Sequence, residues 1–196
     1  MATPNPRQQQ STLVVLVEDQ PGVLTRVVSM MRRRSFNIDS ITVGHSEQPG
    51  VSRITMVVSA PEDQVEQIAK QLYKVIEVLK VTDVTHVPTV SRELALIKVA
   101  AKPQYRSEIM QIAEIYEARI VDATPTSLLV EATGAESKID ALIAMLRGYG
   151  IREMVRSGQL AMARGSAVAS VPETAGSNGR SRDQRILAAA ANGASN

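Results

Sequence analysis

The stretch Val15–Met31, VLVEDQPGVLTRVVSMM, joins two apolar patterns through a charged corner. The apolar run before the corner is typical of a β-strand, whereas apolar residues recur at helical spacing after it. Pro21 fixes its own φ, and Gly22 allows a backbone conformation that a Cβ would exclude. The stretch therefore predicts a strand, a tight corner and a helix in direct succession.

The corner has two interpretations. The first N–H groups of a helix have no partner within the helix and can bind a carboxylate, while Asp19 could meet an ammonium group. Together these features suit a free amino acid. In the alternative, Asp19 caps the helix and Pro21-Gly22 is only a turn. Spacing alone favours the plain turn.

The order strand, helix, hairpin, helix, strand occurs twice along the chain. In the first half we expect a strand at 12–17, a helix at 22–34, a hairpin turning at Gln48-Pro49-Gly50, a helix at 61–80 and a strand at 81–87. In the second half we expect a strand at 93–101, a hairpin turning at Pro125, and a closing strand at 151–163 that is interrupted at Gly158. The apolar residues that mark its two helices are Ile109, Ile112, Ala113 and Tyr116 for one and Ile139, Leu142, Ile143 and Leu146 for the other.

This order predicts an α+β protein with two tandem ferredoxin-like βαββαβ domains. We expect a disordered lead-in at 1–11, a first domain at 12–88, a second at 91–165 and a flexible tail at 166–196. Each sheet would cover one face with two helices and leave an aliphatic face free, which favours oligomerisation.

Composition narrows the function classes. Aromatic residues make up 3% of the 196 residues, so the core must be aliphatic and platforms for stacking single-stranded nucleic acid are missing. A formal charge of +2 is too small for a DNA-binding footprint, and the absence of cysteine excludes disulfides, thiolate zinc sites and a cysteine nucleophile. Without a signal peptide or a long apolar run, we expect a soluble, cytoplasmic protein.

Motifs for catalysis are missing from the sequence. It contains no Gly-x-Ser-x-Gly elbow and no glycine-rich phosphate loop. His45 and His86 have no carboxylate beside them at a spacing typical of a metal site. We therefore expect no metal site, and no catalysis by this chain alone.

The segment TLVVLVEDQPGVLTRVVSMMRRRSFNIDSITVGHSE resembles the first ACT domain of the small regulatory subunits of acetohydroxyacid synthase, also called acetolactate synthase. Further segments extend the resemblance from Thr12 to Gly165: EQIAKQLYKVIEVLKV, VSRELALIKVAA, IVDATPTSLLVEATG and IREMVRSGQLAMARG. SRELALIKV and the RSG…ARG ending are specific to that family, whereas a Pro-Gly-Val-Leu corner occurs in many ACT domains.

The resemblance implies a non-catalytic regulatory subunit with an ACT domain that binds an effector. Such a subunit binds and activates the large catalytic subunit and confers feedback inhibition by valine, or by leucine or isoleucine. Thiamine diphosphate, Mg and FAD are expected on that catalytic partner, and no cofactor on this chain. The resemblance also implies a homodimer formed through ACT domains that pair side by side.

The resemblance further implies an effector site between two paired ACT domains. One copy would contribute the corner, which comprises Asp19, Gln20, Pro21, Gly22, Val23, Leu24 and Thr25. The partner copy would contribute Asn37, Ile38 and Thr42. Many members have asparagine at the position of Asp19. A carboxylate there favours an ammonium and repels a carboxylate, so the resemblance does not decide which amino acid binds.

Two other functions stay open at this stage. A stand-alone ACT-type amino-acid-sensing module or transcriptional regulator would share the fold, although no helix-turn-helix pattern or basic stripe supports it. An enzyme with a site in the second half would form acetolactate from pyruvate without a large subunit.

Overall fold

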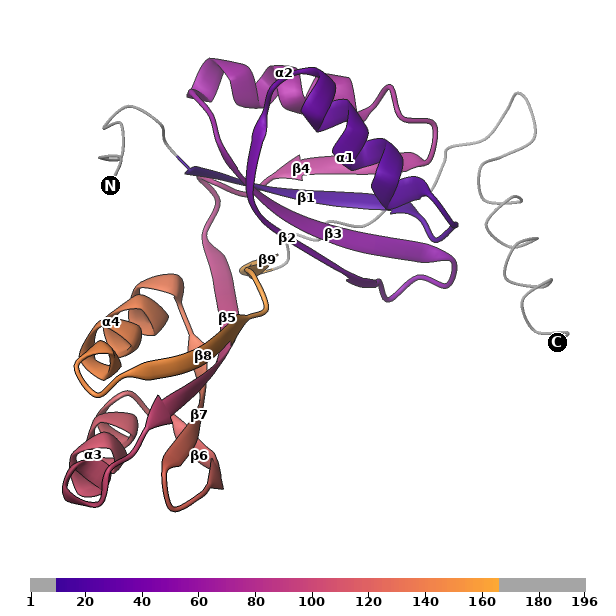
Figure 1. Cartoon of the computed structure of the whole chain (residues 1–196). Helices are drawn as coiled ribbons and strands as arrows, with labels where there is room; N and C mark the ends of the chain where they lie inside the picture. Colours follow the sequence, from indigo (N-terminus) through magenta and orange to yellow (C-terminus); the bar gives the residue numbers. More distant parts are fainter. Residues whose placement is uncertain (1–9, 166–196) are drawn as a thin grey trace, which may run out of the picture. The chain divides into compact units, whose positions relative to one another are not determined.

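The computed structural model describes residues 10–165, which form two compact units (Figure 1). The first unit contains the described residues up to Val90 together with Ala161–Gly165, and the second contains Ser91–Leu160. The predicted tail at 166–196 and most of the predicted lead-in lie outside the described residues. Gln10 and Ser11, which we expected in a disordered lead-in, instead begin the first strand.

The first unit is a four-stranded antiparallel sheet with two helices on one face (Figure 1). Its strands lie in the order β2-β3-β1-β4. Its elements are β1 (Gln10–Glu18), α1 (Val23–Arg33), β2 (Asn37–His45), β3 (Val51–Ser59), α2 (Glu62–Leu72) and β4 (Val78–Asp83). Leu13, Val15 and Val17 of β1 are buried in the aliphatic core on the helix face, as alternation along a strand requires.

Helix α2 is shorter than the sequence predicts. Its apolar period continues to Leu79, but the helix ends at Leu72 and β4 begins at Val78. Val78 pairs with Val17 of β1, and Leu79 is buried on the strand. Ladder pairing with β1 therefore overrides the helical pattern, and Ile76, which we expected on the buried helix face, is 72% exposed.

The second unit repeats the arrangement, with strands in the order β6-β7-β5-β8. Its elements are β5 (Thr89–Ala100), α3 (Arg106–Ile115), β6 (Arg119–Ala123), β7 (Ser127–Gly134), α4 (Glu136–Arg147) and β8 (Ile151–Arg156). A short 3₁₀ turn at Pro103–Tyr105 precedes α3. The predicted α+β class with two βαββαβ units is thus confirmed.

The closing strand of the second unit is divided in two. β8 ends at Arg156, Gly158 adopts a φ of 82°, and β9 (Leu160–Ala163) pairs with β5. Ala161–Gly165 belong to the first unit, whereas the sequence placed them in the second domain. Ala161 packs with Val14 and Val84, which lie on the sheet face opposite the helices. That face of the first unit is therefore partly covered, and not free as we expected.

Candidate functional site

The corner between β1 and α1 is exposed. Gly22 forms the start of α1 with a left-handed φ of 87° and no side-chain cap. Apart from its neighbours in the chain, a Cβ on Gly22 would meet no atom of residues 10–165 within 4 Å. The amides of Leu24 and Thr25 have no acceptor among the described residues, whereas that of Arg26 donates to the Gly22 carbonyl at 3.1 Å. The corner can therefore offer free N–H groups to a ligand at the positive end of the helix dipole.

Asp19 does not cap α1, which contradicts the plain-turn interpretation of its side chain. Its Oδ1 accepts a hydrogen bond from Ser52 Oγ at 3.1 Å, and its Oδ2 lies 3.2 Å from His45 Nδ1. Its amide donates to the Gly50 carbonyl at 2.9 Å. With side-chain exposures of 86% for His45 and 44% for Asp19, this contact is screened by water and contributes under ~1 kcal/mol even when His45 is protonated. Asp19 is thus held against β2 and β3 with its carboxylate partly open to solvent.

His45 and Ser52 are site neighbours that the sequence patterns did not indicate. His45 is the last residue of β2 and Ser52 lies near the start of β3, and the two are paired in register. Ser52 also pairs with Val17 of β1, which brings it beside Asp19. The one sequence signal that could have placed His45 beside Ser52 is the predicted turn at Gln48-Pro49-Gly50, because this turn joins β2 to β3.

The remaining corner residues divide between core and surface. Val23 is buried in the core and anchors the helix start. Leu24 is 43% exposed, and Pro21 and Thr25 are exposed as well. The side-chain Nε2 of Gln20 donates a hydrogen bond to the Glu18 carboxylate at 3.0 Å. The corner therefore presents an aliphatic side chain and free amides on the same exposed turn.

The other predicted site residues lie away from the corner. Asn37 pairs with Ser59, which is opposite Gln10 at the start of β1, whereas the corner follows the end of β1. Eight residues along a strand span about 26 Å. Ile38 is half-buried against the core, and Thr42 pairs with Thr55 farther along β2. A single chain therefore does not bring Asn37 and Ile38 to the corner.

Neither a metal-ligand cluster nor a membrane-spanning helix is present in the part of the chain that the structure describes. No group of three or more histidine, aspartate or glutamate side chains within residues 10–165 could hold a metal ion. None of the helices described there is long and apolar enough to cross a membrane.

Two family models match the chain. A model described as the ACT domain of AHAS small subunit-like proteins matches residues 13–80. A model described as the small subunit of acetolactate synthase matches residues 92–165. The two matches correspond to the two βαββαβ arrangements of the structure.

Curated proteins and a solved structure agree with these matches. A probable acetolactate synthase small subunit of Archaeoglobus fulgidus is 49% identical over 155 residues, which cover 79% of this chain and 97% of that protein. The acetolactate synthase small subunit of Bacillus subtilis is 50% identical over 155 residues, covering 79% and 90%. The crystal structure of the small subunit from Thermotoga maritima is 41% identical with a TM-score of 0.77, covering 81% of this chain and 99% of that chain.

Proposed function

Because the chain belongs to the family of acetolactate synthase small subunits, we propose that it binds a catalytic large subunit, activates it and makes it sensitive to a branched-chain amino acid. Valine is the first candidate effector, ahead of leucine and isoleucine. Thiamine diphosphate, Mg and FAD would belong to the large subunit, where acetolactate formation would take place. This chain would contribute regulation only.

The open corner at Gly22 is the observation that carries the effector proposal. The free amides of Leu24 and Thr25 suit the carboxylate of an amino acid, and the helix dipole adds to that attraction. The Asp19 carboxylate suits the ammonium group, since it has lone pairs left beyond those facing Ser52 and His45. The exposed Leu24 offers apolar contact to a branched side chain.

A second copy of the chain would complete this site. Asn37 and Ile38 lie near the end of the sheet opposite the corner of their own chain. Two ACT domains that pair side by side in opposite directions would bring these residues of one copy to the corner of the other. Effector binding would then depend on how the two copies sit together, which gives the amino acid a means of favouring one state of the pair. A coupling of about 1–3 kcal/mol is typical of such linkage.

The test compares Gly22→Asp with Gly22→Asn. Aspartate and asparagine have nearly the same size, and both tolerate a positive φ better than most residues. The two variants therefore share the backbone strain and differ in charge. We expect G22D to need at least tenfold more valine for half-inhibition than G22N, because its carboxylate repels that of the effector. Acetolactate formation by the reconstituted holoenzyme over a valine series measures this difference.

Activation of the large subunit is the control. Both variants should still activate it, because Gly22 is exposed and a Cβ there meets none of the described residues beyond its chain neighbours within 4 Å. Full valine sensitivity in G22D would show that the effector site lies elsewhere. Calorimetric titration of the wild-type chain with valine, leucine and isoleucine ranks the three effectors.

A further inference from the structure

The effector corner has a histidine beside it. His45 ends β2, and its Nδ1 lies 3.2 Å from Asp19 Oδ2. The ring is exposed, so it exchanges protons with the solvent freely. Histidine is the side-chain type that changes its charge between about pH 5 and 8, whereas aspartate ordinarily stays ionised in that range. The group that contacts the carboxylate of Asp19 can therefore change its charge while the carboxylate keeps its own.

The two oxygens of Asp19 have different partners. Ser52 Oγ donates to Oδ1 at 3.1 Å, and a hydroxyl brings no charge. His45 faces Oδ2, where a protonated ring brings a full positive charge and a neutral ring brings none. With the ring neutral, Asp19 presents a net negative charge to a ligand. With the ring protonated, the pair presents none.

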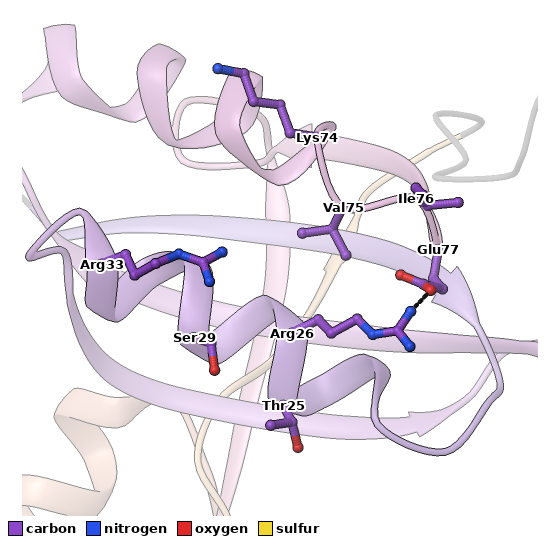
Figure 2. Close-up of a pocket in the computed structure, with 8 residues that line it drawn as sticks. All are labelled: Thr25, Arg26, Ser29, Arg33, Lys74, Val75, Ile76 and Glu77. Carbon is purple, nitrogen blue, oxygen red and sulfur yellow. Dashed lines mark ion pairs between the residues drawn. The ribbon is translucent and has the colours of Figure 1, made fainter.

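The other charged groups described around the corner are carboxylates and guanidinium groups, which do not ordinarily change charge between about pH 5 and 8. Glu18 ends β1, and Glu47 lies in the turn between β2 and β3, where it attracts Arg53 of β3. On α1, the guanidinium of Arg26 is directed to Glu77, in the loop before β4, and pairs with it (Figure 2). The imidazole is therefore the group at this corner whose charge follows the pH.

We propose that His45 makes effector binding at the corner depend on pH: the neutral ring permits binding and the protonated ring opposes it. This role rests on the proposed function, in which Asp19 receives the ammonium group of the effector. A protonated ring neutralises that carboxylate and places a like charge beside the ammonium. The amides of Leu24 and Thr25, which would hold the effector carboxylate, have no charge to change. Binding should therefore weaken as the pH falls.

The test titrates the full chain with valine by calorimetry at about pH 7.5 and at about pH 5.5, which lie on either side of the range where histidine ordinarily gains its proton. The ionic strength is low and the same in both, because salt screens exposed charges. Free valine keeps both of its charges between these pH values. We expect the Kd to rise about threefold to fivefold at the lower pH, as for an exposed charge pair. A rise of less than about 1.5-fold in the wild-type chain would overturn the proposal.

The chain contains 2 histidines, and the second supplies the matched control. His86 follows Asp83, which pairs with Leu13 near the start of β1, whereas the corner follows the end of that strand. His45→Gln should bind valine equally well at both pH values, while His86→Gln should keep the pH dependence of the wild-type chain. His45→Lys stays charged and should bind weakly at both. A pH dependence that survives in H45Q, or is lost in H86Q, would show that His45 is not the group responsible.

Linkage gives a second readout on the wild-type chain itself. If the neutral ring favours valine, valine must favour the neutral ring by the same factor. The NMR signals of the His45 ring should therefore titrate at a lower pH with saturating valine than without it, and those of His86 should not move. A midpoint for His45 that stays in place contradicts the proposal. A midpoint that rises also contradicts it, because it would place the effector carboxylate, and not the ammonium, beside the ring.

Gly22→Asp and Gly22→Asn separate a failure of this proposal from a failure of the proposed function. At about pH 7.5, where histidine is ordinarily neutral, their valine affinities show whether the effector binds at the corner. If G22D binds at least roughly tenfold more weakly than G22N and H45Q keeps its pH dependence, the corner is the site and only the role of His45 is wrong. If valine does not bind, or binds both variants equally, the site is misplaced and both proposals fall.

Discussion

At the scale of single residues, Gly22 shows that conformation and space are separate constraints. A Cβ there has open space, yet the φ of 87° is one that residues other than glycine adopt at a cost. Strain of this kind amounts to about 1–3 kcal/mol. Any substitution at Gly22 therefore carries a cost unrelated to the effector, which is why the test compares two substitutions with each other rather than with the wild-type chain.

Arg156 connects three elements of the second unit. Its Nε and Nη2 donate to the two oxygens of Glu93 at 2.7 and 2.6 Å, and its Nη1 donates to Asp140 at 2.7 Å. Hydrogen bonding to Glu93 raises the pKa of Arg156, so the guanidinium stays charged. The side chain of Glu93 is 7% exposed. The two segments that are most specific in the sequence, around SRELALIKV and RSG, meet in this ion pair.

Arg156→Ala should lower the free energy of unfolding by about 2–3 kcal/mol, since it leaves the buried Glu93 carboxylate without its partner. This is below the cost for a fully buried pair, because Arg156 is 29% exposed. Arg156→Lys keeps the charge but loses the two-pronged geometry, so it should cost about half as much. Urea unfolding measures both. A cost for R156A within about 0.5 kcal/mol of zero would show that the network contributes nothing to stability.

At the scale of elements, the boundary between α2 and β4 depends on partners far away in the sequence. Tyr73 follows the end of α2, and its hydroxyl accepts a hydrogen bond from the Val81 amide at 3.0 Å and lies 3.3 Å from the Val81 carbonyl. β4 is an edge strand of the sheet, so the outward backbone groups of Val81 have no neighbouring strand. The tyrosine thus closes the helix end against the strand that follows it.

Tyr73→Phe should destabilise the first unit by about 0.5–1 kcal/mol, because the Val81 amide loses its acceptor at a site that water can reach. Hydrogen exchange at Val81 should become several-fold faster, which is the more direct readout. Tyr105→Phe is the matched control, because no hydrogen bond of the Tyr105 hydroxyl is found within residues 10–165. Unchanged exchange at Val81 in Y73F would contradict this role for Tyr73.

At the scale of the whole molecule, the sequence predicted what local patterns determine. The helical period in α1 and the turn at Gln48-Pro49-Gly50 both appear as expected. Both βαββαβ arrangements follow from the order of these patterns. The features that were missed depend on strand pairing: the short α2, the contact of Asp19 with His45 and Ser52, and the return of β9 to the first unit. A single sequence does not display such long-range partners.

The candidate site was predictable only in part for the same reason. The corner was identified because its residues are consecutive, and the structure adds which amides are free and which way Asp19 is held. The role of Asn37, Ile38 and Thr42 rests on the resemblance and stays a prediction. The distance of Asn37 and Ile38 from the corner of the same chain is consistent with a contribution from a second copy.

The chain leaves the first unit after Val90 and returns to it at Ala161. Besides strand pairing and the packing of Ala161, two hydrogen bonds hold the returning segment. Arg53 on β3 donates to the Ala161 carbonyl at 2.8 Å, and the Arg164 amide donates to the Pro88 carbonyl at 2.7 Å. Burial lowers the pKa of the Arg53 guanidinium. The segment therefore belongs to the stability of the first unit, although the sequence places it after the second.

Ala161→Asp and Met162→Asp test this assignment with two neighbours on β9. Ala161 is 5% exposed beside Val14 and Val84, whereas Met162 is 65% exposed. A161D should cost about 2–4 kcal/mol, since it buries a carboxylate among apolar groups. M162D should stay within about 0.5 kcal/mol of the wild-type chain. Hydrogen exchange then shows which unit loses stability in A161D. Backbone amides of β1 in the first unit should exchange faster than in the wild-type chain, while those of β7 in the second unit should not. Equal costs for the two variants, or faster exchange confined to β7, would show that the returning segment does not support the first unit.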